Sequence, residues 1–179
     1  MDKTFNLHVA GLERELPLCP IAEDTYIAAF VMFSDVELTV ACASELLKKA
    51  PEFDVIITAE SKGIPLAYEM SRQSGKKYIP ARKSKKLYMK NAVGVEVQSI
   101  TTEGKQHLYL AGADMDYLKG KRVLIVDDVI STGESLRALV ELVEQAQGNI
   151  VGKAAVLAEG DAAQRTDILF LEELPIFHF

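Results

Sequence analysis

Residues 123–135 read Val123-Leu124-Ile125-Val126-Asp127-Asp128-Val129-Ile130-Ser131-Thr132-Gly133-Glu134-Ser135. The four apolar residues at its start are typical of a buried strand at the centre of a parallel sheet. Two carboxylates follow at the carboxyl end of that strand, where open α/β sheets bind their ligands. A short loop of small and hydroxyl-bearing residues then enters a helix. This order predicts an α/β fold with a ligand site at one edge of the sheet.

The loop from Ser131 to Ser135 has the composition of an anion site. Its backbone N–H groups and hydroxyls can donate to phosphate oxygens, and Gly133 allows a ligand to approach closely. The start of the following helix adds positive potential. Asp127 and Asp128 lie just upstream, where carboxylates can accept hydrogen bonds from sugar hydroxyls. A phosphate site beside a receptor for a vicinal diol indicates binding of a ribose 5-phosphate.

The pattern on either side of this stretch alternates between strands and helices. Helices are expected at 34–49, 64–74 and 134–147, and strands at 53–58, 77–81, 122–126, 154–158 and 168–171. Such alternation predicts a doubly wound, mainly parallel central sheet flanked by helices. Ser34 and Glu37 have the spacing of a capping box, which makes Ser34 the expected N-cap of the first helix.

Two stretches, 93–100 and 106–110, alternate apolar and polar residues around the turn-like segment 101–105. They predict a two-stranded antiparallel excursion with an exposed tip. Since no linker, repeat or low-complexity segment interrupts the 179 residues, we expect a single domain over 1–179.

Composition excludes several classes of protein. Hydrophobic residues make up 49% of the chain and charged residues 26%, as in an ordinary folded globule. The net charge of -6 argues against nucleic acid as a partner. Cys19 and Cys42 form no CxxC motif, the longest apolar run covers only Ile27 to Phe33, and the N-terminus lacks a signal peptide. We therefore expect a cytoplasmic protein with free thiols and no membrane partner.

The 123–135 stretch resembles the phosphoribosyl-pyrophosphate (PRPP) motif of the type I phosphoribosyltransferases, in which four apolar and two acidic residues precede a Thr-Gly loop. The resemblance extends from about residue 53 to the C-terminus. It implies a core over 35–179 and a small N-terminal hood, residues 1–34, that recognises a base. It also implies that Asp127 and Asp128 hold the ribose of PRPP. The residues implied for its 5-phosphate are Ser131, Thr132, Gly133, Glu134 and Ser135.

Residues 59–63 follow a strand and precede a helix, where this family has its pyrophosphate loop, often with a non-proline cis peptide. The loop looks most like the adenine-type form. The residues that the resemblance implies for pyrophosphate are Glu60, Ser61, Lys62, Gly63, Arg82, Lys83 and Lys86. Glu60 would repel pyrophosphate if it pointed inward, so we expect it to point away or to hold the loop in shape.

The excursion from Leu87 to Leu110 is similar to the flexible loop that closes over substrate in this family. By the same resemblance, Glu103 is a candidate for the loop glutamate that assists a proton on the base. It joins Asp127 and Asp128 as candidate catalytic residues. The candidates for the base pocket are Val129, Ile130, Phe30 and Phe33.

The function implied by the resemblance is purine salvage: adenine and PRPP become AMP and pyrophosphate. Mg²⁺ is expected on substrate oxygens and water, with no direct protein ligand, and the protein is expected to be a homodimer. The alternatives are another purine, xanthine first, or a PRPP or nucleotide sensor without catalysis. A P-loop NTPase is excluded because the sequence contains no GxxxxGK followed by Ser or Thr.

Overall fold

The computed structural model describes residues 3–97 and 105–179. Five strands form a central sheet in the order β10-β9-β8-β4-β5, and all of its pairings are parallel. These strands are β4 (Val55–Ala59), β5 (Lys77–Ala81), β8 (Arg122–Ile130), β9 (Asn149–Glu159) and β10 (Leu169–Leu174). The predicted parallel α/β core is therefore confirmed.

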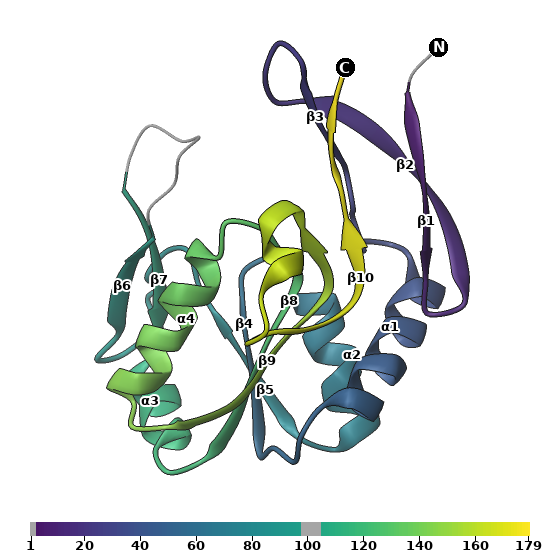
Figure 1. Ribbon diagram of the computed structural model, residues 1–179. Helices are drawn as coiled ribbons and strands as arrows, with labels where there is room; N and C mark the ends of the chain where they lie inside the picture. The colour runs from purple at the N-terminus through teal and green to yellow at the C-terminus, as the bar shows by residue number, and fades with distance from the viewer. Residues whose placement is uncertain (1–2, 98–104) are drawn as a thin grey trace.

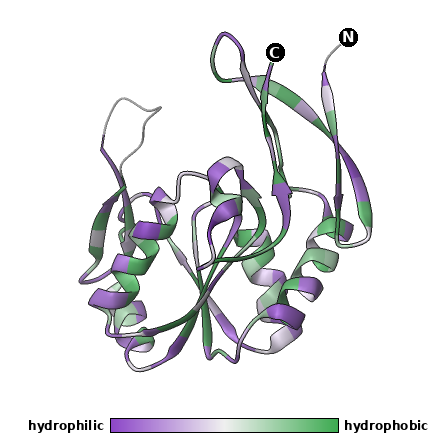
Figure 2. Cartoon of the chain, viewed as in Figure 1, coloured by the Kyte–Doolittle hydropathy of each residue, from purple (hydrophilic) through white to green (hydrophobic). Residues whose placement is uncertain are grey.

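Helices cover both faces of this sheet (Figure 1). One pair is α1 (Val36–Lys49) and α2 (Ile64–Ser74), and the other is α3 (Gly112–Leu118) and α4 (Glu134–Gln145). Each pair packs into its own hydrophobic cluster against the sheet. Hydrophobic and hydrophilic residues, green and purple in Figure 2, alternate along α1 and α4, as expected for helices with one buried face. A short 3₁₀ helix, η1 (Gly160–Gln164), follows β9.

The start of α1 differs from the expectation. Asp35, and not Ser34, is the N-cap, and its side chain accepts a hydrogen bond from the backbone N–H of Leu38. Glu37 does not reach back to the cap, because its carboxylate accepts from Arg14 at 2.8 Å. Arg14 also binds Asp35 at 2.7 Å. This cation comes from a strand more than twenty residues away, so local spacing could not reveal it.

The hood is a four-stranded antiparallel sheet in the order β1-β2-β3-β11. Its strands are β1 (Thr4–Val9), β2 (Leu12–Pro20), β3 (Thr25–Ala28) and β11 (Ile176–His178). The expected hood of residues 1–34 thus gains a strand from the other end of the chain. Ile176 pairs with Ile27, and the rings of Phe5 and Phe177 lie 5.3 Å apart.

The predicted antiparallel excursion consists of β6 (Val93–Val97) and β7 (Gln106–Leu110). A bridge between Arg82 and Tyr109 ties it to the end of β5. In Figure 1 this hairpin and the hood rise on opposite sides of one edge of the central sheet. That edge is the one at which the parallel strands end.

The course of the chain places a topological switch between β4 and β8. From β4 the chain continues to β5 on one side, whereas from β8 it continues to β9 on the other. Pairing of β4 with β8 ends at Ile57 and Ile125, but β8 stays paired with β9 as far as Ile130. The two central strands therefore separate near their carboxyl ends, which is where doubly wound sheets bind ligands.

Candidate active site

A cleft of about 500 Å³ lies at this switch point. One wall comes from the hood, and the floor comes from the segments that follow β4 and β8. The lining residues are Cys19, Ile27, Ala28, Ala29, Phe30, Val31, Ala59, Glu60, Ser61, Lys62, Lys83, Gln106, Asp127, Asp128, Val129, Ser131, Ser135, Glu159 and Leu174. The cleft joins residues of opposite charge from segments far apart in the sequence.

The two predicted carboxylates meet in this cleft. β8 runs on through Ile130, so Asp127 and Asp128 belong to the strand and do not follow its end at Val126 as expected. Asp127 Oδ1 accepts a hydrogen bond from the backbone N–H of Asp128 at 2.8 Å. Burial and the neighbouring Asp128 raise the pKa of Asp127, whereas the charge of Lys62 acts in the opposite direction. This pair is suited to accept hydrogen bonds from a diol and to attract cationic character.

Residues 131–135 form the wall of a smaller cavity of about 140 Å³ that Asp127 also lines. Gly133 has a φ of +81° and is the N-cap of α4. A Cβ at Gly133 would lie 2.8 Å from Nη1 of Arg165, so backbone conformation and close contact both favour glycine. The N–H groups in the first turn of a helix such as α4 can bind an anion. The cavity is therefore suited to a phosphate group.

The segment between β4 and α2 contains a cis peptide bond between Glu60 and Ser61. This is the non-proline cis peptide that the resemblance implied. Gly63 packs against Asp127: a Cβ there would lie 2.2 Å from Thr58 Oγ1 and 3.1 Å from Asp127 Oδ1. Since its φ of -76° suits any residue, close approach is what requires glycine at this position. The loop is thereby held against the acidic pair.

Glu60 holds the loop in shape, which is one of the two arrangements that were expected for this side chain. Its carboxylate accepts from the backbone N–H of Lys83 at 2.9 Å and from Arg82 Nε at 3.0 Å. The same two hydrogen bonds lower the pKa of Glu60. The Glu60 carboxylate therefore joins the segment after β4 to the segment after β5.

The basic residues after β5 do not all reach the cleft. Lys83 lines it, together with Lys62. Arg82 is instead bound to Glu60 and donates to the hydroxyl of Tyr88. Lys86 donates to Ser84 Oγ at 2.7 Å. Of the three cations that were expected after β5, the structure brings Lys83 to the cleft.

The candidate base residues separate into two groups. Phe30 and Val129 line the cleft. Phe33 is 46% exposed and lies outside it, and Ile130 is buried in the core beneath the phosphate cavity. Val129 also lines the smaller cavity, where Ile130 lies beside it. Glu103 lies outside the described residues.

Several lining residues carry no local sequence signal. Cys19 and Ile27 reach the cleft because the hood folds over it, whereas Glu159 and Leu174 reach it at the ends of β9 and β10. Arg165 contacts the phosphate turn from the segment after η1, where Asp167 holds it at 2.8 Å. Each of these positions depends on long-range pairing that hydrophobic periodicity does not report.

The acidic and metal-ligating side chains of the described residues indicate how the site could hold a metal ion. Within residues 3–97 and 105–179, no group of three or more His, Cys, Asp or Glu side chains is gathered to hold a metal. An acidic pair beside a phosphate cavity fits Mg²⁺ that arrives on phosphate and water oxygens, since this ion rarely uses an all-protein cage.

In the same described ranges, no helix is both long and apolar enough to cross a membrane.

Comparison with known proteins gives the family of the chain. Residues 40–175 match the model of the phosphoribosyl transferase domain. The adenine phosphoribosyltransferase of Acetivibrio thermocellus is 35% identical over 148 residues, which cover 78% of this chain and 80% of the relative. A hypoxanthine/guanine phosphoribosyltransferase of Methanothermococcus okinawensis is 34% identical over 161 residues, covering 86% of this chain and 84% of the relative.

Solved structures show the same fold. The crystal structure of adenine phosphoribosyltransferase from Thermoanaerobacter pseudethanolicus aligns with a TM-score of 0.67 at 24% identity, covering 79% of this chain and 84% of that one. The enzyme from Saccharomyces cerevisiae, solved with an imino-altritol bisphosphate and adenine, aligns with a TM-score of 0.62 at 23% identity, covering 76% and 78%. Because the domain model matches residues 40–175 and the Acetivibrio thermocellus relative is 35% identical over most of both chains, the chain belongs to the phosphoribosyltransferase family.

Proposed function

We propose that this protein is an adenine phosphoribosyltransferase, which converts adenine and PRPP into AMP and pyrophosphate. The observation that carries the proposal is the meeting of three elements at one switch point. Asp127 and Asp128, the 131–135 turn and the cis-peptide loop at Glu60 line adjoining cavities. Such a site can hold a sugar by its diol, its terminal phosphate and its leaving group at once.

The reaction follows from these positions. The turn at 131–135 anchors the 5-phosphate, and Asp127 and Asp128 accept from the ribose hydroxyls. Their negative charge stabilises the sugar as it becomes cationic. Lys62 and Lys83 stabilise the leaving pyrophosphate, and Ser61 lies beside them in the cleft. Bound Mg²⁺, held on pyrophosphate oxygens and water, would neutralise part of that charge. Because the sugar is fixed at both ends, most of the catalysis is positioning.

Adenine is favoured over other bases by the relatives named for it and by the adenine-type loop at Glu60–Gly63. The hypoxanthine/guanine relative is nearly as similar, so the alternative is another purine. We expect adenine to give the highest kcat/KM in a panel of adenine, hypoxanthine, guanine, xanthine, uracil and orotate with PRPP and Mg²⁺. Pyrophosphate release measures turnover, and a higher value for any other base would contradict the assignment.

The second candidate is a PRPP or nucleotide sensor without turnover. It predicts that PRPP binds but that no base in the same panel releases pyrophosphate. The cations in the cleft favour an enzyme, because Lys62 and Lys83 lie where a leaving pyrophosphate needs them. The two free thiols, Cys19 and Cys42, support the cytoplasm as the compartment of the reaction.

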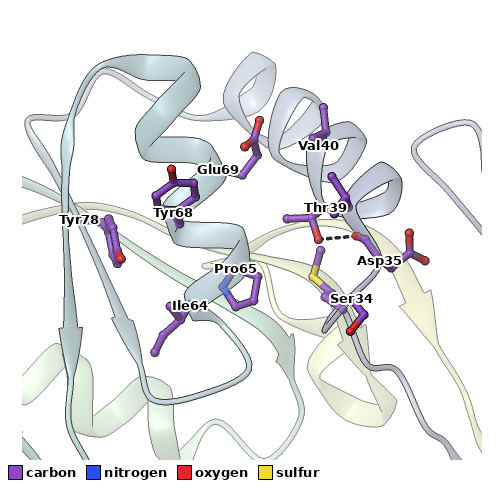
Figure 3. A pocket seen from close by; sticks show the side chains of 11 residues that line it. Ser34, Asp35, Thr39, Val40, Ile64, Pro65, Tyr68, Glu69 and Tyr78 are labelled. Carbon is purple, nitrogen blue, oxygen red and sulfur yellow. Dashed lines mark hydrogen bonds between the residues drawn. The ribbon is translucent and has the colours of Figure 1, made fainter.

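We also propose that the protein is a homodimer. An apolar groove of about 360 Å³ lies between α1 and α2, with Thr39 and Val40 on one helix and Pro65 and Tyr68 on the other (Figure 3). Tyr68 is 55% exposed. The groove adjoins the pyrophosphate loop, since α2 begins directly after Gly63. Exposed apolar patches of this kind mark interaction surfaces.

A second copy of the chain fits this groove by apolar contact. Val36, Val40 and Tyr68 lie among its lining residues and are exposed, as are the side chains of Leu87 and Tyr88 after the basic segment 82–86. In a twofold dimer each copy can place Leu87 and Tyr88 against the apolar groove of the other. The lining of the groove and this segment both adjoin the cleft.

The oligomeric state tests this proposal. Sedimentation of the wild-type protein is expected to give twice the chain mass of 19.7 kDa. Tyr68→Asp is expected to sediment as a monomer, because it buries a charge in the interface. Ile21→Asp, at an equally exposed residue of the hood, is the matched control and should remain dimeric. A wild-type monomer at all concentrations would exclude the dimer.

A further inference from the structure

Thr58 carries a buried hydroxyl that has no hydrogen-bond partner among the described residues. The residue is 0% exposed. It follows Ile57, whose pairing with Ile125 is the last between β4 and β8. Thr58 therefore lies where the two strands separate, under the pyrophosphate loop and beside the acidic pair.

Gly63 fills the gap between the strands at this point. A Cβ on Gly63 would lie 2.2 Å from Thr58 Oγ1 and 3.1 Å from Asp127 Oδ1, so both oxygens lie close to the space that a side chain at position 63 would take. The hydroxyl is shut off from solvent, since Thr58 is fully buried. An acceptor for Thr58 must therefore come from the protein, and Asp127 presents a carboxylate at the same place.

The Thr58 hydroxyl is a donor without an acceptor, and the Asp127 carboxylate is an acceptor close to it. A buried hydroxyl without a partner is disfavoured. Burial and the neighbouring Asp128 raise the pKa of Asp127, although the backbone N–H of Asp128 already donates to its Oδ1. A further donor would stabilise the ionised carboxylate, which is the form that accepts most strongly from a sugar diol. A small movement of Gly63 or of the Asp127 side chain would let the Thr58 hydroxyl supply a donor.

We propose that Thr58 is a positioning residue for PRPP: its hydroxyl donates to the Asp127 carboxylate in the PRPP-bound state and fixes it toward the ribose. This inference rests on the proposed function, since it needs PRPP as ligand. The Thr58 hydroxyl should therefore have different effects on the PRPP-bound and the free protein. The hydroxyl contributes to PRPP binding, yet it contributes nothing favourable to the free protein, where it has no partner.

Thr58→Ala and Thr58→Ser test the hydroxyl directly, because the two variants differ in that group alone. Calorimetry with PRPP and Mg²⁺ is expected to show about tenfold weaker binding for Thr58→Ala than for Thr58→Ser, the cost of one hydrogen bond to a charged group. In steady-state assays the KM for PRPP should rise by a similar factor and the KM for adenine should not change. In the free protein, Thr58→Ser should unfold at a temperature no higher than that of Thr58→Ala, because the hydroxyl has no partner there.

Thr39 gives the matched control. It is 8% exposed, but its hydroxyl donates to the carbonyl of Asp35 at 2.8 Å in α1. Thr39→Ala should be less stable than Thr39→Ser, in contrast to the pair of variants at Thr58. The inference is overturned if Thr58→Ala and Thr58→Ser bind PRPP equally, or if the free Thr58→Ser protein is the more stable. A wild-type protein that binds no PRPP would instead overturn the proposed function, and this inference with it.

Discussion

Replacement of both Asp127 and Asp128 by asparagine is expected to lower turnover by at least about a thousandfold while the protein stays folded. Both side chains line the cleft. The amide keeps the shape of the carboxylate but removes the charge that stabilises a cationic sugar, and it offers one acceptor where the carboxylate offers two. Pyrophosphate release with adenine and PRPP gives the measurement. Turnover within about tenfold of wild type would remove the role assigned to the pair.

The stability of this variant separates a catalytic effect from unfolding. The pKa of Asp127 is raised in the folded protein, so its ionisation opposes folding. That opposition is absent at a pH below the ordinary pKa of 3.8, develops as pH rises toward the folded-state pKa, and persists above it. At neutral pH the double asparagine variant does not carry the free-energy cost of an ionised Asp127 in the folded protein. Its unfolding temperature should therefore equal or exceed that of the wild-type protein.

Gly63→Ala is expected to lower kcat/KM for PRPP by about a hundredfold or more, because the added methyl group has no room. It would lie 2.2 Å from Thr58 Oγ1 and 3.1 Å from Asp127 Oδ1. Thr58 is fully buried and cannot swing aside, so the pyrophosphate loop or Asp127 must move. Either movement separates groups that hold the two ends of PRPP.

The double variant Gly63→Ala with Thr58→Ala provides the control. Removing the Thr58 hydroxyl relieves the closest contact, so this double variant should bind PRPP more tightly than Gly63→Ala alone. Thermal unfolding should show the same order, with Gly63→Ala the least stable of the three proteins. If Gly63→Ala keeps the kcat/KM of the wild-type enzyme, the close packing of loop and acidic pair has no role in catalysis.

The central fold and half of the site follow from local sequence. The run of buried residues in β8, the Gly75 end of α2 and the alternating strands β6 and β7 are each determined by neighbours in the chain. So is the 131–135 turn, since a phosphate site at a helix start needs only a few consecutive residues. These are the features that periodicity, caps and a short motif can report.

What the sequence did not reveal depends on distant segments. The N-cap of α1 is Asp35 and not the expected Ser34. Arg14, which lies on β2 of the hood, binds Asp35 and Glu37. Phe33 has the same chemistry as Phe30, and only the path of the chain after β3 decides that Phe30 lines the cleft and Phe33 does not. Arg82 turns from the cleft because Glu60 and Tyr88 bind it. In each case a partner that is remote in sequence selects between two locally equivalent positions.

The pairing of β11 with β3 also has a consequence for synthesis. Ribosomes make proteins from the N-terminus, so β1, β2 and β3 leave the ribosome before the core, and Ile176–His178 follow it. The edge of β3 that later receives β11 stays unpaired during that interval, and an unpaired edge can associate with another nascent chain. The wall of the cleft is therefore completed only after the core and residues 131–135 have been made.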